Sequence, residues 1–398
     1  PTIVVNEPEQ RIRLDGLMFE FMNVPGSEAP SEFVFNVPEL KLFGAAELFS
    51  HTLHNLYTLR GAKVRDALKW VDYMNQAMVM SKDAEVVVFQ HNWPVWGREE
   101  IVEFTTKQRD VYKFIHDQTV RMINAGYTPI EIAERVRMPE ELDQFFSARG
   151  FYGTLSHNIK AVYQFYMGWY DANPANLNPI EPVEAAKRYV ELAGGMDKLL
   201  SSAQDAFDAG DYRWASELLK HAVYADPDHD EARELAARSF EQMGYVAESG
   251  PWRNVYLSGA RELRGAEPKR SVDRKRILGL LEQTPLERFF EVMGASLNAE
   301  RAAGENLIIN FTFSDLNENY VFHVNNSVLN FRKAPESLEA TATLTLTKPF
   351  FLRMMVGDAG PLAMLISSET DIEGSLGDLR TFFGLLDQAE GDFALITP

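Results

Sequence analysis

A pair of glutamates, Glu28 and Glu47, is the strongest candidate for a reactive site in this sequence. The segment between them predicts a hairpin, with a strand over 33–37, a turn at 38–39 and a returning strand over 40–45. Because the turn lies midway, we expect the glutamates to be opposed, with Cα atoms roughly 4.5–5.5 Å apart. Carboxylates that close repel each other unless a cation or a shared proton lies between them. An alternative interpretation is two surface acids at the end of a loop.

Histidines and arginines lie near this pair in the sequence: His51, His54, Arg60, Arg65 and His91. Imidazole and carboxylate groups are ligands for divalent metals. The guanidinium group presents paired donors that suit an oxyanion such as sulfate. These residues could therefore complete a metal site that handles an anion, although each of them taken alone is equally compatible with a structural role.

The absence of cysteine restricts the kind of site that the chain can hold. Any metal must be bound by histidine and carboxylate, because no thiolate is available. Eight histidines are present, but none belongs to an H-x-H-x-D-H or H-E-x-x-H motif. A nucleophile elbow, a P-loop and a G-x-G-x-x-G turn are also missing from the sequence. A site must therefore be assembled from distant residues.

Composition and charge exclude several classes of protein. The formal net charge of −19 argues against nucleic acid as a partner, because phosphates attract Lys and Arg. No apolar run reaches the roughly 18–20 residues that a transmembrane helix needs, so we expect no transmembrane segment. The chain opens at Pro1 within a strand-like stretch, and we expect that the protein continues upstream of it.

Patterning along the chain predicts three domains, 1–105, 106–270 and 271–398. The first alternates strands with a helix over 60–80 and is α/β. The second is all-α, with candidate helices over 99–125, 129–137, 162–170 and 183–193. Within it, small residues and a closing proline over 196–250 indicate a tetratricopeptide-like helical hairpin, or else a plain helix pair.

The third predicted domain is α+β and follows a basic linker over 264–276. Its pattern predicts a helix over 277–295 and a second helix over 348–356. The predicted strands span 307–314, 319–324, 328–332 and 340–347. The fold class expected for the whole chain is therefore multi-domain α/β plus all-α plus α+β.

Several long motifs identify a family. The sequence resembles the metallo-β-lactamase-fold alkyl sulfatases over nearly its whole length. The motifs that carry the resemblance are PGSEAPSE (25–32), HTLHNLYTLRGAKVRDA (51–67), HNWPVWG (91–97), RGFYGTLSHN (149–158) and DANPANL (171–177). The resemblance implies a site with two zinc ions that hydrolyses alkyl sulfates, such as dodecyl sulfate, to alcohol and inorganic sulfate.

The resemblance also implies roles for individual residues. Glu28 would ligate one zinc, Glu47 would bridge or support both, and His91 would complete the second zinc. Arg60 would bind the sulfate group, assisted by Arg65. The remaining zinc ligands of the family lie in an H-x-H-x-D-H run, which is expected upstream of this chain.

The resemblance extends to the other two domains. It implies that the helical region forms a homodimer through interlocking arms, and that the last domain is like sterol carrier protein 2 and receives the alkyl tail. Candidate tunnel residues are Phe350, Phe351, Leu352, Met354, Met355, Leu362, Met364, Phe382 and Phe383, which are equally compatible with an ordinary core. A periplasmic or secreted location is implied by the resemblance alone.

One departure from the family pattern bears on activity. The family usually has His-His-Trp where this chain has His91-Asn92-Trp93. If the second histidine is the ligand, it is lost here, because an amide replaces imidazole poorly at zinc. The alternative to an active hydrolase is therefore a catalytically impaired, dimeric surfactant- or lipid-binding protein of the same fold.

Overall fold

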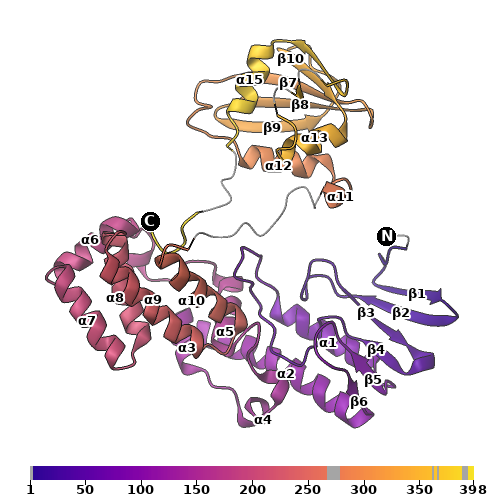
Figure 1. Ribbon diagram of the computed structural model, residues 1–398. Helices are drawn as coiled ribbons and strands as arrows, with labels where there is room; N and C mark the ends of the chain where they lie inside the picture. The colour runs from indigo at the N-terminus through magenta and orange to yellow at the C-terminus, as the bar shows by residue number, and fades with distance from the viewer. Residues whose placement is uncertain (1–2, 267–277, 361–362, 365–366, 388–392) are drawn as a thin grey trace. The chain divides into compact units, whose positions relative to one another are not determined.

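The structure is a computed structural model that describes residues 3–266, 278–360, 363–364, 367–387 and 393–398. The chain divides into two compact units (Figure 1). Unit 1 comprises Pro1–Ala266 together with Ala394–Pro398, and unit 2 comprises Glu267–Phe393. No helix of the described residues is both long enough and apolar enough to cross a membrane.

A six-stranded sheet forms the N-terminal part of unit 1 (Figure 1). Its strands lie in sequence order: β1 (Glu9–Leu14), β2 (Leu17–Asn23), β3 (Phe33–Val37), β4 (Leu42–Gly44), β5 (Val86–Val88) and β6 (Val95–Trp96). Neighbouring strands are antiparallel except β4 and β5, which run parallel and are connected through helix α1 (Ala67–Met80). The strands predicted over 33–37 and 85–89 are confirmed.

The predicted domain boundary at residue 105 falls inside helix α2 (Arg98–Ile123). The buried side chains of α2 belong to the same apolar core as those of β3, β4 and α1. Helix α5 (Leu155–Met167) contributes to this core as well. A division at residue 105 would expose that shared core, so the α/β and helical regions form one unit.

The remaining helices of unit 1 are α3 (Pro129–Arg135), α4 (Glu140–Asp143), α6 (Pro182–Leu192), α7 (Met196–Asp208), α8 (Tyr212–Ala225), α9 (Asp230–Tyr245) and α10 (Gly250–Leu263). The pattern of small residues over 196–250 corresponds to the pair α8 and α9. These helices pack through Ala215, Ala222 and Ala232, whose side chains are fully buried. The chain returns to α10 near its end, where the backbone N–H groups of Leu395 and Ile396 donate to Glu262.

Unit 2 contains a five-stranded sheet in the order β11-β10-β7-β8-β9. Its strands are β7 (Leu307–Phe313), β8 (Glu318–Asn325), β9 (Val328–Lys333), β10 (Ala342–Leu346) and β11 (Thr370–Gly374). Strands β7 and β10 are parallel and the other pairs are antiparallel. The four strands predicted for this region are confirmed, whereas β11 was not predicted.

Helices of unit 2 include α11 (Leu278–Leu281), α12 (Leu286–Ala295), α13 (Lys348–Met355) and α15 (Leu376–Gly384). The single helix predicted over 277–295 is divided, because Pro285 adopts an extended conformation and precedes α12 as its N-cap. Several of the predicted tunnel residues are buried in the core of this unit: Phe350, Phe351, Leu352, Met364 and Phe382. Leu362 lies outside the described residues.

Candidate metal centre

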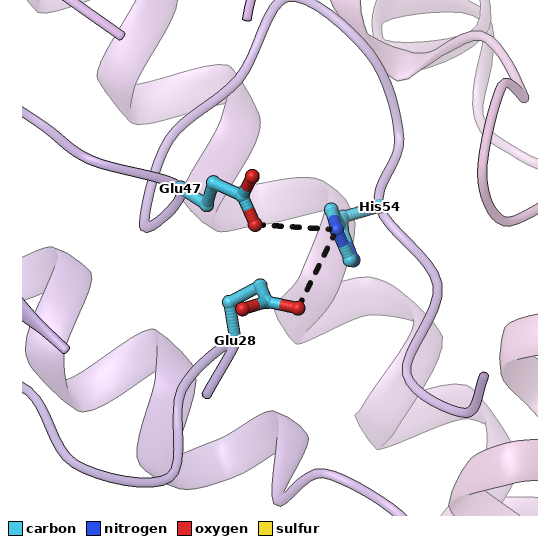
Figure 2. A group of neighbouring side chains, drawn as sticks. All are labelled: Glu28, Glu47 and His54. Atoms are coloured by element: carbon cyan, nitrogen blue, oxygen red, sulfur yellow. Dashed lines mark ion pairs between the residues drawn. The ribbon is translucent and has the colours of Figure 1, made fainter. Parts of the chain in front are cut away.

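Three side chains from separate parts of unit 1 converge on one point: Glu28, Glu47 and His54 (Figure 2). One ligand atom from each lies within 4.8 Å of the others. His54 Nε2 is 4.0 Å from Glu28 Oε1 and 3.8 Å from Glu47 Oε2. Glu28 lies between β2 and β3, whereas Glu47 and His54 follow β4. The predicted carboxylate pair therefore exists, and a histidine completes it.

The carboxylates do not meet in the way that the hairpin predicts. The register of β3 and β4 pairs Phe35 with Gly44, so its extension places Glu47 opposite Glu32. The prediction that Glu28 and Glu47 are opposed is therefore wrong by four residues. The chain turns back on itself after β2, where the N–H of Val24 donates to the carbonyl of Glu32 at 2.9 Å. This turn brings Glu28 to the pair.

Glu32 holds the two carboxylate loops together. Its Oε2 accepts from the Ser27 hydroxyl at 2.7 Å and from the backbone N–H of Glu28 at 3.1 Å. Its Oε1 accepts from the backbone N–H of Glu47 at 2.9 Å. Glu32 ends the first motif of the sequence but was not predicted as a site residue. Its role depends on backbone groups that the sequence does not place.

Arg65 is bound to Glu28, and most of its side chain is buried. Its Nη2 pairs with Glu28 Oε1, and its Nε donates to the carbonyl of Glu28. Its Nη1 donates to the carbonyl of Asn55 at 2.7 Å and to the Asn55 amide oxygen at 2.9 Å. Burial lowers the pKa of Arg65, and the Coulomb attraction of Glu28 opposes that shift. All three guanidinium nitrogens are engaged, so this geometry supports a positioning role for Arg65.

His54 is neutral and its Nε2 is unprotonated. Nδ1 lies 3.0 Å from the carbonyl oxygen of Asn55, which can only accept, so Nδ1 carries the proton. Burial lowers the pKa of His54 to about 4, and the nearby Arg65 contributes to this shift. The lone pair of Nε2 therefore faces two carboxylate oxygens. This donor set fits a divalent cation, because lone pairs directed at one another repel unless a positive charge lies between them.

The backbone of His54 is held from two helices. Its N–H donates to the hydroxyl of Tyr112 at 3.0 Å, and its carbonyl accepts from the amide of Asn158 at 2.9 Å. Asn158 also accepts from the N–H of Leu56 at 2.9 Å. Both partners are buried. The imidazole is thus positioned by α2 and α5, some 60 and 100 residues along the chain.

His91 contacts the other oxygen of Glu47. Its Nε2 is 2.5 Å from Glu47 Oε1, whereas Oε2 faces His54. Burial raises the pKa of Glu47, as do the negative charges of Glu28 and Glu32, while the hydrogen bond from His91 opposes the shift. His91 is thus a neighbour of the cluster through Glu47, and its role as a ligand stays a prediction.

Asn92 and Arg60 lie at the surface. Asn92 is exposed and has a left-handed φ of 68°, a conformation that asparagine adopts more readily than most residues. His91, and not position 92, is therefore the side chain directed at Glu47. Arg60 is exposed on the loop after His54 and makes no ion pair with any residue that the structure describes.

His54 was not among the residues predicted to bind metal. The motif at 51–67 contains both His51 and His54, and nothing in it distinguishes them. His51 instead stacks on Trp93 with ring centroids 4.9 Å apart, and its Nδ1 lies 3.3 Å from the Ser147 hydroxyl. It is buried among aromatic side chains. The histidine–carboxylate pattern could suggest a candidate, but only side-chain direction selects His54.

Comparison with known proteins shows the family of the chain. Residues 128–266 match a family model described as alkyl sulfatase dimerisation, and residues 278–398 match one described as alkyl sulfatase C-terminal. A linear primary-alkylsulfatase of a Pseudomonas species is 35% identical over 391 residues, which are 96% of this chain and 73% of that protein. This chain belongs to the alkyl sulfatase family. The resemblance noted from the sequence motifs is confirmed.

Other alkyl sulfatases match the chain along its whole length. An alkyl/aryl-sulfatase of Saccharomyces cerevisiae is 43% identical over 400 residues, covering 100% of this chain and 61% of that protein. The solved structure of a stereoselective inverting sec-alkylsulfatase from Pseudomonas sp. superposes with a TM-score of 0.93 at 37% identity, covering 100% of this chain and 63% of that one. The chain spans about 60% of the length of the first curated relatives that it matches.

Proposed function

We propose that this chain is the C-terminal part of a zinc-dependent alkyl sulfatase, which hydrolyses alkyl sulfate esters to an alcohol and inorganic sulfate. The observation that carries the proposal is the convergence of His54 Nε2 with the carboxylates of Glu28 and Glu47, at 4.0 and 3.8 Å. Histidine and carboxylate ligands suit zinc, and no cysteine is present to offer an alternative. The names of the relatives support the reaction class.

In this proposal Glu28, Glu47 and His54 are this chain's zinc ligands, and His91 completes the second metal or orients Glu47. The two zinc ions would also be bound by ligands upstream of this chain. When bound, zinc acts as a Lewis acid that activates water and offsets negative charge. The carbonyl of Asn55 keeps the Nδ1 proton of His54 in place, so that Nε2 remains available to the metal.

The arginines have different tasks in this proposal. Arg65 fixes the position of Glu28 and compensates its charge. Arg60 binds the sulfate group of the substrate, because its guanidinium presents paired donors and has no ion pair among the described residues. A positive group beside an otherwise acidic site lowers the cost of bringing an anion close to two carboxylates.

The remaining parts have supporting roles in the same proposal. The six-stranded sheet and its helices would be the C-terminal part of a metallo-β-lactamase fold. The helical region over 128–266 would form a homodimer, which the description of the matching family model supports. Unit 2 would be like sterol carrier protein 2 and receive the alkyl tail, a role that rests on the resemblance of the sequence to the family.

A non-catalytic surfactant binder has less support. This alternative was suggested by Asn92, which stands where the family usually has a histidine. His91, however, is the residue whose ring contacts Glu47. The carboxylates, His54 and the arginine that holds Glu28 are all present.

The test is the release of sulfate from dodecyl sulfate by the full-length protein, with and without a chelator, alongside a zinc count. We expect about two zinc ions per chain and loss of activity on chelation. Glu47→Gln should lose zinc and at least about a hundredfold in rate, because its carboxylate is a ligand. Glu99→Gln, at an exposed position in α2, is the matched control. Less than one zinc and no turnover in the unaltered protein would contradict the proposal.

A further inference from the structure

Residues 394–398 belong to unit 1, although the whole of unit 2 precedes them in the sequence, and they attach to the last turns of α10. The backbone N–H groups of Leu395 and Ile396 donate to the same oxygen, Oε1 of Glu262, at 2.7 and 2.9 Å. The side chain of Ile396 packs against the apolar core formed by α7, α8, α9 and α10. Leu395, by contrast, is 65% exposed. The attachment therefore consists of one apolar side chain and two hydrogen bonds to one carboxylate.

Two residues of α10 differ from those that an isolated helix favours. Gly259 lies inside the helix, where glycine is less favourable than alanine. A Cβ at this position would lie 3.1 Å from Cδ1 of Ile396, which is tighter than an ordinary contact, so the glycine leaves room for that side chain. Glu262 lies in the last turn, where the helix dipole disfavours a negative charge. The attachment of Ile396 and its neighbour gives a physical reason for both residues.

The carboxylate of Glu262 is available to the returning segment because the neighbouring cation is already bound. Arg264 pairs with Glu234 and Glu241 on α9. Within the part of the chain that the structure describes, Glu262 forms no ion pair, and its charge is compensated by the two backbone N–H groups. Hydrogen bonds to an ionised acceptor are stronger than those between neutral groups. Glu262 is therefore the principal polar anchor of the segment.

Both connections between the units are anchored at the same end of α10. The first leaves the helix after Leu263, its last residue, and the second is fixed at Glu262. While the segment is attached, the second connection consists of residues 388–393, which can span at most about 25 Å. Without the attachment, unit 2 is joined to α10 only through residues 267–277, which can span at most about 40 Å. The attachment therefore shortens the reach that the chain allows to unit 2.

We infer that residues 394–396 are a reversible clasp that restricts the movement of unit 2 relative to α10. When the clasp is attached, unit 2 is held by two connections that meet at one helix end, and when it is released, only one connection remains. Release breaks two hydrogen bonds and uncovers one side chain, which is a small change compared with unfolding either unit. The clasp concerns the linkage of the units and does not depend on the proposed reaction.

The experiment compares Ile396→Asp, Glu262→Ala and Phe393→Asp in the full-length protein. Phe393 is 73% exposed and lies on the same connection, so Phe393→Asp adds the same charge without changing a group that touches α10. Amide hydrogen exchange is measured by mass spectrometry on the peptide that contains residues 393–398. In the unaltered protein and in Phe393→Asp, we expect exchange about tenfold or more slower than in the free peptide. In Ile396→Asp and Glu262→Ala this protection should be lost, and Glu262→Ala leaves the clasp residues themselves unchanged.

Small-angle X-ray scattering on the same proteins measures the consequence for unit 2. The maximum dimension should increase by up to about 15 Å in Ile396→Asp and Glu262→Ala, which is the difference between the two reaches, and should not change in Phe393→Asp. Tryptophan emission checks that unit 1 remains folded. The inference is overturned by unprotected amides in the unaltered protein, or by lost protection with unchanged scattering. An equal increase in Phe393→Asp would overturn it as well, because added charge would then be the cause.

Discussion

The two units bury different kinds of side chain. Among the described residues, unit 2 buries Asn310 as its one polar side chain outside tyrosine, within a core rich in phenylalanine. Unit 1 buries many polar side chains, and several surround the carboxylate pair. They include Ser27, His51, His54, Asn55, Thr154, His157 and Asn158.

This difference shows where the molecule accepts an energetic cost for function. A buried polar group is destabilising unless it finds a partner. Unit 1 supplies partners by hydrogen bonds between distant segments, as at His54, Arg65 and Asn158. Unit 2 is stabilised mainly by apolar burial, which needs no such network. The candidate metal centre accordingly lies in unit 1.

The largest effect should come from the apolar core of unit 2. Phe290 is fully buried, and Phe290→Ala should cost about 4 kcal/mol through lost burial and a cavity. Its ring lies near those of Phe313, Tyr320, Phe322, Phe331 and Phe351. Urea unfolding followed by circular dichroism should show an earlier transition for this unit.

Tryptophan fluorescence separates the two units in that experiment. All six tryptophans lie between residues 70 and 252, so their emission reports unit 1. The unfolding transition that this emission reports should lie at the same urea concentration in Phe290→Ala as in the unaltered protein. Leu338→Ala is the control, because Leu338 is fully exposed and its loss should have little effect. An equal shift of both signals would mean that the units unfold together and that the comparison fails.

A change of nearly equal size is expected at the buried ion pair of unit 1. Arg65→Leu removes the partner of Glu28 and leaves that carboxylate facing Glu47, at a cost of about 3 kcal/mol. The tryptophan-detected transition should move to lower urea concentration. Arg60→Leu, at an exposed position, should leave stability within about 0.5 kcal/mol of the unaltered protein. Equal stability of the two variants would contradict the prediction that the ion pair of Arg65 and Glu28 stabilises unit 1.

A matched pair of asparagines sharpens the comparison. Asn158 bonds to His54 and Leu56, and Asn310 bonds to Ser337 and Thr343. Asn158→Ala and Asn310→Ala should each lower the free energy of unfolding by about 2 kcal/mol, because the groups that bond to the amide lose their partner. Only Asn158→Ala should also weaken zinc binding, measured by competition with a chelator. Equal zinc affinity in the two variants would show that Asn158 does not support zinc binding at the site.

The smallest effect is a dependence of unit 1 stability on pH. His157 is neutral and bonded on both sides, since Trp252 Nε1 donates to its Nδ1 at 2.8 Å and its Nε2 donates to the carbonyl of Tyr57 at 2.7 Å. Burial lowers its pKa below the ordinary value of 6.5. The unfolded chain therefore takes up the proton first as pH falls below 6.5, and stability declines in that range.

The measurement is urea unfolding at pH 7 and pH 5, followed by tryptophan fluorescence. The decline should be smaller in His157→Gln, because glutamine does not titrate. Its stability at pH 7 should be lower than that of the unaltered protein, since one of the two hydrogen bonds is lost. The same pH dependence in both proteins would show that His157 does not contribute to it.

Local patterning was sufficient for most elements of secondary structure. Strand β3 is a short run of aromatic and β-branched residues, and α2 repeats apolar residues at helical spacing, so each could be predicted from neighbours in sequence. Strand β11 was missed because it lies at the sheet edge and is mostly polar and exposed. The domain boundary at 105 was misplaced because burial across α2 depends on segments that follow it.

The sequence by itself determined the kind of chemistry, since it contains two glutamates, several histidines and arginines, and no cysteine. The tertiary structure decided which of these side chains meet. His54 faces the carboxylates while His51 is buried among aromatic rings, although the two are three residues apart. The reason is that loop conformation fixes side-chain direction, and these loops are held by Glu32, Tyr112 and Asn158 through hydrogen bonds between distant segments.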